Sequence, residues 1–328
     1  MNTVAQITIH PSQFPDAVRR DLLESLRSRQ INHKFHYDSV KQTHRWLALH
    51  QAYAPSRTDP DCQRIYEAAF ATAAAQHPAL KAHVIGLGCG GGQKDTRLLR
   101  HLAALGRDLL YTPCDVSVPM VLVARAAALA VVPEENCLPL VCDLATADDL
   151  PEFFQTRRPA EVPRLITFFG MLPNFDPDAV MPRLAALLRP HDRLLLSANL
   201  APGPDYAAGV ERVLPQYDNE LTHDWLMTLL LDLGVERGDG RLGFGIQEYP
   251  PGSGLRRIAA LFRFERPRAL VVEGERFDFA PGETLRVFFS YRYTPERVRR
   301  LLARHGLELR EQWITDSEEE GVFLCRRA

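Results

Sequence analysis

The sequence predicts an α/β fold, with a mostly parallel sheet in one domain, joined to a second α+β domain. From Lys81 onward, short apolar runs alternate with amphipathic helical runs, which is the pattern of βαβ units. After Leu200 the alternation stops, and a helical run at 221–233 precedes hairpin-like strands around 246–265 and 269–279. The length of 328 residues, with 46% hydrophobic residues, fits about two domains.

The elements of the first domain follow in order along the chain. Its expected strands are 83–86, 109–114, 138–142, 164–169 and 193–198, and its expected helices are 94–105, 118–130, 147–155 and 178–188. We expect a strand at 285–293, a helix from Thr294 and Pro295 to Gly306, and strands at 309–315 and 321–325 to rejoin this domain. The charged residues 316–320 are expected to form a solvated hairpin tip.

The N-terminal 60 residues contain helical runs at 16–29 and 40–51, and we expect them to cap another part of the molecule. The predicted division is therefore a core of residues 61–200 and 285–328, and a substrate-binding domain of residues 1–60 and 201–284. The core should be Rossmann-like, with a mostly parallel sheet and an antiparallel strand near the C-terminus.

Composition narrows the class of protein. The chain has 39 Lys and Arg against 41 Asp and Glu, so its formal charge of -2 gives no field that would attract nucleic acid or an anionic membrane. Its apolar runs are shorter than the ~18 to 20 residues of a membrane span, and residues 1–29 lack the pattern of a secretory signal, so we expect a cytoplasmic protein. Six scattered cysteines without a Cys-x-x-Cys pair indicate buried free thiols and no metal site.

The segment 83–96 holds the clearest local motif, a strand that runs into a glycine cluster and then into a helix. Gly88 and Gly90 allow a tight turn and a close approach of backbone to ligand, and the helix N-terminus offers free N–H groups. Asp115 ends the second strand, near the offset at which an acid binds ribose hydroxyls in dinucleotide-type sites. The pattern therefore favours a nucleotide-like cofactor over a merely flexible loop.

Three classes of nucleotide-binding site are candidate interpretations of this turn. A P-loop needs Gly before and Ser or Thr after its lysine, but Lys94 is flanked by Gln93 and Asp95. A dinucleotide site fits loosely, because Gln93 stands where the last glycine is expected. An S-adenosylmethionine site uses the same turn, with a second acid after the third strand, where Asp143 stands; alone, Asp143 could equally be a helix cap.

Taken together, these motifs resemble the histidine-specific, S-adenosylmethionine-dependent α-amino N-methyltransferases of ergothioneine synthesis. The likeness covers nearly the whole chain, and its strength lies in the order and spacing of the pieces. They are residues 34–38 (KFHYD), 53–57 (YAPSR), the glycine turn with Lys94, 114–116 (CDV), 142–144 (CDL), 168–174 (FFGMLPN), 188–192 (LRPHD), 216–218 (QYD) and 279–283 (FAPGE) leading to Ser290.

The resemblance implies a role for particular residues. Those that would bind the cofactor are Tyr37, Gly88, Gly90, Lys94, Asp115, Asp143 and Leu144, with Asp115 on the ribose and Asp143 near the adenine. Tyr53, Asn174 and Tyr217 would hold the amine and carboxylate of the amino acid and serve the reaction. Asn174 is the best supported of these by position, because it follows the fourth strand at the sheet edge where ligands bind.

The sequence also departs from the family pattern. The family has an acid where Gly86 ends the first strand, and the loop 170–174 is one residue short. The family's histidine enzymes have a carboxylate two residues before the serine that matches Ser290, whereas this chain has Phe288 there. A second position that lines the acceptor pocket is Ala260. Both changes favour an apolar or aromatic acceptor over histidine.

The sequence therefore predicts transfer of methyl groups from S-adenosylmethionine to the α-amino nitrogen of an amino acid or a derivative, up to a betaine. The alternatives are an NAD-dependent dehydrogenase and a non-catalytic binding protein with the same fold. The sequence indicates a small-molecule substrate and leaves the oligomeric state open.

Overall fold

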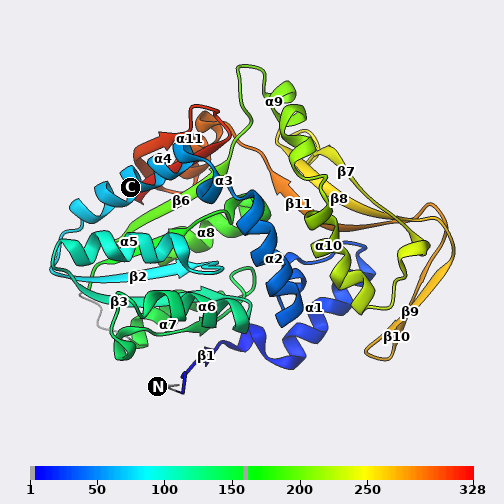
Figure 1. The fold of residues 1–328 in the computed structure, drawn as a ribbon, viewed down its shortest axis with the longest axis horizontal. Coiled ribbons are helices and arrows are strands. Elements are labelled where there is room, and N and C mark those ends of the chain that lie inside the picture. The colour runs from blue at the N-terminus through cyan, green and yellow to red at the C-terminus, as the bar shows by residue number, and fades with distance from the viewer. Residues whose placement is uncertain (1–3, 158–161) are drawn as a thin grey trace. The chain divides into compact units, whose positions relative to one another are not determined.

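The computed structural model describes residues 4–157 and 162–328 and separates into two compact units (Figure 1). Unit 1 comprises Met1–Gln13, Pro55–Leu200 and Thr294–Ala328, and unit 2 comprises Phe14–Ala54 and Ala201–Tyr293. No helix among the described residues is both long and apolar enough to span a membrane.

Unit 1 is built on an eight-stranded sheet with the order β1-β4-β3-β2-β5-β6-β13-β12. The strands are β1 (Thr8–Ile9), β2 (Lys81–Leu87), β3 (Asp108–Asp115), β4 (Leu140–Val141), β5 (Arg164–Phe168), β6 (Arg193–Asn199), β12 (Leu307–Ile314) and β13 (Glu320–Arg327). The first six run parallel, and β13 is antiparallel to both of its neighbours. The order reverses at β2, so the carboxyl ends of β2 and β5 form the crevice at which open α/β sheets bind ligands.

Helices connect these strands and begin where the sequence supplies caps. They are α3 (Pro55–Thr58), α4 (Pro60–Ala75), α5 (Gln93–Ala104), α6 (Val118–Ala128), α7 (Leu150–Arg157), α8 (Pro177–Leu187) and α11 (Pro295–Arg304). Asp59, Ser117, Asp176 and Thr294 each accept a hydrogen bond from a first-turn amide, and a proline stands in the first turn of each of these helices. Apolar side chains of α4 and α5 pack with β2 and β3 in the main core.

Two expectations about unit 1 were wrong. Residues 8 and 9 do not belong to a cap, because they pair in parallel with Leu140 and Val141 at the edge of the large sheet. A two-residue strand carries too short a pattern to be recognised. The predicted strand 285–293 does not join this sheet either, because it pairs with a strand of unit 2.

Unit 2 contains an antiparallel sheet with the order β11-β8-β7, and a separate hairpin of β9 and β10. The strands are β7 (Gly240–Glu248), β8 (Arg256–Phe264), β9 (Arg268–Val272), β10 (Glu275–Phe279) and β11 (Thr284–Tyr291), and the helices are α1 (Pro15–Arg27), α2 (Val40–Tyr53), α9 (Tyr206–Val213) and α10 (Glu220–Asp232). Ala260, Phe262 and Phe264 of β8 pack with α10 in one apolar core. The apolar sequence of β11 predicted a buried strand correctly, but it could not specify which sheet the strand joins.

A register shift in β11 sets which side chains share a face of this small sheet. The shift lies between Arg286, opposite Leu261, and Phe288, opposite Ala260. Successive side chains of a strand point to opposite faces, so Phe288 and Ser290 share the core face with Ala260. Phe289 and Tyr291 share the other face, together with Arg257 of β8.

Candidate active site

The glycine turn after β2 is shaped by left-handed backbone angles that glycine adopts without strain. Gly88, Gly90 and Gly92 have φ of 65°, 50° and 72°. A β-carbon at Gly88 would lie 2.5 Å from the Cγ and Sδ of Met171, and one at Gly92 would lie 2.7 Å from the Cα of Ala124. The turn is therefore closed in by the loop after β5 and by α6, and only glycine fits.

Asp115, the last residue of β3, is fixed against this turn. Its Oδ2 accepts a hydrogen bond from the backbone N–H of Gly90 (3.0 Å), and its Oδ1 accepts one from the N–H of Ser117 (3.1 Å). Burial raises the pKa of this carboxyl to about 6, against the opposing effect of the amide bonds. The carboxylate that the sequence assigned to ribose thus stands beside the turn in a fixed orientation.

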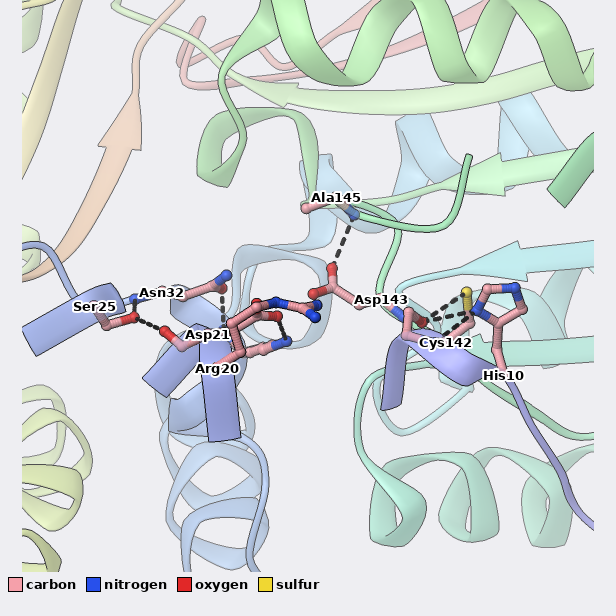
Figure 2. A network of polar contacts seen from close by, with 10 residues as sticks. His10, Arg20, Asp21, Ser25, Asn32, Cys142, Asp143 and Ala145 are labelled. Carbon is pink, nitrogen blue, oxygen red and sulfur yellow. Dashed lines mark hydrogen bonds and ion pairs between the residues drawn. The ribbon is translucent and has the colours of Figure 1, made fainter. Parts of the chain in front are cut away.

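Asp143 and Leu144 follow β4 and are both buried. Figure 2 shows Cys142 and Asp143 beside His10 of the N-terminal segment. The amide of Asp143 donates to Ser12 Oγ (3.0 Å), which lies 2.9 Å from His10 Nδ1. Ser12 Oγ also donates to Cys142 Sγ (3.8 Å), and the Asp143 carboxylate accepts from the amide of Ala145 (2.8 Å). No local pattern indicated Ser12, because Cys142 and Asp143 lie about 130 residues away along the chain.

Lys94, at the start of α5, belongs to a chain of polar groups that the sequence did not predict. Its ammonium donates to the Tyr66 hydroxyl (2.7 Å), which donates to Glu320 Oε1 (2.5 Å). Burial lowers the pKa of Lys94. The expectation of a wholly solvated turn at 316–320 was wrong for Glu320, whose side chain is only 12% exposed.

Gly86, where the family pattern has an acid, lies beside a carboxylate from another element. A β-carbon at this position would lie 2.0 Å from Oδ2 of Asp95, which is on α5. Asp95 is buried and accepts hydrogen bonds from the hydroxyls of Thr167 (2.7 Å) and Tyr111 (2.8 Å). Burial raises its pKa to about 6. An acid from α5 therefore occupies the space beside position 86, where the family resemblance predicts an acid.

Asn174 ends the short 3-10 helix Leu172–Asn174 that follows β5. Its side-chain amide donates to the carbonyl of Gly170 (3.3 Å), and the amide of Gly170 donates to Ser197 Oγ of β6 (2.9 Å). Met171 of the same loop covers Gly88. The structure therefore brings Asn174 and the glycine turn to the same edge of the large sheet, where β2 and β5 end.

In unit 2, Tyr217 and Ser290 lie together. The Tyr217 hydroxyl donates to Ser290 Oγ (2.9 Å) and accepts a hydrogen bond from Arg292 Nη2 (2.8 Å). Tyr217 follows the 3-10 helix Leu214–Gln216, and Ser290 is buried on β11. Arg292 was not among the predicted residues; only its place two residues beyond Ser290 could have indicated it.

Phe288 lies at the centre of an aromatic cluster next to this pair. His33 stacks on its ring at 4.9 Å between centroids, and Trp225 meets the ring edge-on at 5.7 Å. Tyr217 lies 6.3 Å away, and Ala260 pairs with Phe288 across the strands. Four predicted acceptor residues, Tyr217, Ala260, Phe288 and Ser290, therefore lie in one wall.

Two predicted residues lie at other places in unit 2. Tyr37 follows the 3-10 helix His33–His36 and contacts Trp225 (5.6 Å) and Trp46 (6.0 Å). Tyr37 is thus linked to the cluster through Trp225. Tyr53 is the last residue of α2, and its side chain is 53% exposed.

Comparison with known proteins identifies the chain. The model of a family described as "Histidine-specific methyltransferase, SAM-dependent" matches residues 18–327, nearly the whole sequence. This chain belongs to that family. It is therefore an S-adenosylmethionine-dependent methyltransferase, which excludes the dehydrogenase and the non-catalytic alternatives. No curated protein matched the sequence.

Solved structures of other methyltransferases are similar to the chain at low identity. Magnesium protoporphyrin IX methyltransferase from Synechocystis PCC 6803, with bound SAH, is 14% identical, with 90% of this chain and 98% of that one covered and a TM-score of 0.45. The CcbJ methyltransferase from Streptomyces caelestis is 17% identical, with 80% and 89% covered and a TM-score of 0.39. The predicted Rossmann-like methyltransferase fold is confirmed by the family match and by the strand order of unit 1.

The residues present in unit 1 fit the family's cofactor. The glycine turn exposes backbone that a side chain would cover, and Asp115 stands beside it with both carboxylate oxygens oriented by backbone amides. A carboxylate held in this way suits a ribose diol, because each oxygen keeps a lone pair for a hydroxyl donor.

Proposed function

We propose that this enzyme methylates the α-amino nitrogen of an amino acid, up to three times, and that it prefers an apolar or aromatic side chain to histidine. In this proposal most of the cofactor-binding residues belong to unit 1, and the residues that select the acceptor side chain belong to unit 2. The observation that supports this specificity is the wall of Phe288, Ala260 and Ser290 on one face of β8 and β11. In this wall an apolar ring stands two residues before the serine, where the family resemblance predicts a carboxylate.

On the cofactor side, Asp115 would accept hydrogen bonds from the ribose hydroxyls, and Asp143 would accept one from the adenine amine beside Leu144. Gly88 and Gly90 would let the backbone approach the cofactor closely. Lys94 and Tyr37 complete the proposed set. These roles rest on the family resemblance and on the position of the unit 1 residues at the carboxyl ends of β2, β3 and β4.

When bound, S-adenosylmethionine supplies a methyl group on a positively charged sulfur, which is already a strong electrophile. The protein must therefore present an amine whose lone pair is unprotonated and aligned, and a strong base is not required. Asn174, Tyr53 and Tyr217 would orient the amine and carboxylate of the amino acid. The Asn174 side chain has the oxygen to accept from an amine and the N–H₂ to donate to a carboxylate.

Histidine should bind poorly against Phe288. A buried imidazole N–H facing a phenyl ring would lack an acceptor, which costs about 1 to 3 kcal/mol, or up to about a hundredfold in specificity. An apolar or aromatic side chain has no such donor, and it gains ring contact in a cluster that already includes Trp225 and Tyr217.

The deciding experiment is a comparison of kcat/KM for histidine, phenylalanine, tyrosine and tryptophan, with mass spectrometry to count the methyl groups. We expect histidine to be at least tenfold poorer than the best of the others. Phe288→Glu should shift the preference toward histidine, whereas Phe288→Leu, which changes shape without adding charge, should not. A histidine kcat/KM equal to or above the rest in the wild type would overturn the proposed specificity.

A second measurement tests the role of Asn174. Asn174→Ala should lower kcat/KM by about ten- to a hundredfold while the Kd for S-adenosylhomocysteine stays within about twofold, because the proposed contact is with the acceptor. Asn136→Ala, in a surface 3-10 helix of the same unit, is the matched control. A loss of cofactor affinity in Asn174→Ala would assign this side chain to the cofactor instead.

A further inference from the structure

We propose that unit 2 carries an anion-binding site, formed by Arg257, Arg286 and His33 around the ring of Phe289, that takes a carboxylate or phosphate group. Phe289 and Arg257 lie on the face of the β11-β8-β7 sheet opposite Phe288, and His33 contacts the rings of both Phe288 and Phe289. The anion-binding site is separate from the proposed function and does not depend on it.

The three nitrogen-bearing side chains converge on one ring. The guanidinium carbons of Arg257 and Arg286 each lie 4.9 Å from the ring centroid of Phe289, and the His33 ring lies 4.4 Å from it. Arg257 also stacks at 3.8 Å on the ring of Tyr249. Cation–π contacts with these rings help to hold both guanidinium groups in place.

No ion pair joins Arg257 or Arg286 to a carboxylate within residues 4–157 and 162–328. The Arg257 side chain is nearly buried, at 4% exposed, and its hydrogen bonds go to the amide oxygen of Gln247 (3.3 and 3.1 Å). A buried arginine without a carboxylate is uncommon in proteins, because the charge must be desolvated without compensation.

Two buried hydrogen-bond donors at the same place have no partner among the described residues. Nε of Arg286 is buried without a hydrogen-bond partner. His33 Nε2 accepts a hydrogen bond from the backbone N–H of Phe289 (3.0 Å), so the proton of the neutral ring is on Nδ1, and Nδ1 is also buried without a partner. Two orphaned donors beside two uncompensated positive charges form the complement of an oxyanion.

The electrostatics agree with this arrangement. Burial and the positive charge of Arg257 lower the pKa of Arg286 to about 10. Burial lowers the pKa of His33 well below its usual value, and the nearby His36, Arg286 and Arg257 lower it further. An anion bound among these side chains would offset the electrostatic repulsion between the positive charges.

The same face has room for a ligand. Gly245 pairs with Ala259 and Gly243 with Leu261, so β7 contributes no side chain at these two positions of the face that holds Arg257 and Phe289. A β-carbon added at either glycine would meet no atom within 4 Å. A group the size of a carboxylate or phosphate could therefore reach the arginines across these two positions.

The test is isothermal titration of the full chain with sodium phosphate and, separately, with sodium succinate, each at constant ionic strength. We expect saturable binding of at least one anion. Arg286→Gln and Arg257→Gln should each weaken it at least tenfold, because each removes one charge-assisted donor set. Arg263→Gln, an exposed arginine of the same strand, should bind like the wild type.

The two titrations distinguish the source of the anion: binding of phosphate alone assigns a phosphoryl group, and binding of succinate alone assigns a carboxylate. Saturable binding of neither anion by the wild type would overturn the proposal, as would wild-type affinity in Arg286→Gln. The wild-type titrations need no variant, so they test the proposal even if a variant does not fold.

Discussion

The glycine turn of unit 1 and the proposed acceptor wall of unit 2 are built in opposite ways. The shape of the turn is determined mainly by the backbone, because three glycines have positive φ and amide N–H groups orient the carboxylate of Asp115. In the wall, distant side chains meet, such as His33 with Phe288 and Tyr217 with Ser290. A site made of backbone tolerates little change, whereas a wall made of side chains can change its specificity while the fold persists.

The strongest test of this comparison is Asp115→Ala. The carboxylate would form two charge-assisted hydrogen bonds worth about 1.5 to 3 kcal/mol each, so the Kd for S-adenosylhomocysteine should rise by about a hundredfold or more. Calorimetric titration measures this directly. Asp108→Ala, at the exposed start of the same strand, should leave the Kd unchanged. Equal affinity in Asp115→Ala and wild type would remove Asp115 from the ribose site.

A smaller effect is expected from Gly88→Ala, with Gly106→Ala as its matched control. Both glycines have positive φ, 65° and 71°, so both substitutions carry the left-handed strain of about 1 to 2 kcal/mol. Only the alanine at position 88 adds a clash, which is with Met171, because nothing lies within 4 Å of a β-carbon at Gly106. Urea unfolding should show the greater loss for Gly88→Ala, and its cofactor affinity should fall about tenfold or more. Similar losses in both variants would mean that Met171 simply moves aside.

Cofactor affinity should also depend on pH. The raised pKa of Asp115, about 6, means that its carboxyl becomes protonated as the pH falls through 6, and the protonated form can no longer accept two hydroxyl donors through charge-assisted bonds. The Kd for S-adenosylhomocysteine should therefore be about tenfold higher at pH 5 than at pH 8. Asp115→Asn should bind weakly at both values. A surviving pH dependence in that variant would point to Asp95, whose pKa is also about 6.

The smallest effect concerns Tyr217→Phe. Loss of the hydroxyl removes its bonds to Ser290 and Arg292, which contribute about 1 kcal/mol each. We expect the KM for the amino acid to rise about fivefold, with the Kd for S-adenosylhomocysteine unchanged. Tyr206→Phe removes a hydroxyl that bonds two backbone groups, the carbonyl of Arg292 and the amide of Arg256, and should lower stability without this rise in KM.

The sequence predicted unit 1 well because each βα unit carries its own signals. Ser117 and Thr294 cap predicted helices, and the predicted strands are continuous apolar runs. The helix Pro60–Ala75, which Asp59 caps, was not predicted. What the sequence could not show was pairing between distant segments. The strand at Thr8–Ile9 is too short to have a period, and Glu320 is part of a charged run that is typical of solvent-exposed turns. Its contact with Tyr66 depends on the fold as a whole.

Unit 2 was harder to predict for a related reason. The apolar pattern of β11 predicted a strand, but neither its sheet nor its bulge can be read from that pattern. The bulge decides which of Phe288 and Phe289 faces Ala260. Predicting Phe288 as a residue of the wall therefore required a comparison with the family motif. His33 was missed because the two phenylalanines that it contacts lie about 255 residues away along the chain.

The carboxylate of Asp95 beside Gly86 constrains the evolution of the cofactor turn. If residue 86 were an acid and Asp95 remained, two buried carboxyl groups would compete for the same space. A β-carbon at residue 86 would lie only 2.0 Å from Asp95 Oδ2. If Asp95 were lost first, the hydroxyls of Thr167 and Tyr111 would be left without their shared acceptor. Neither single change should be neutral, so the effects of substitutions at positions 86 and 95 should not add.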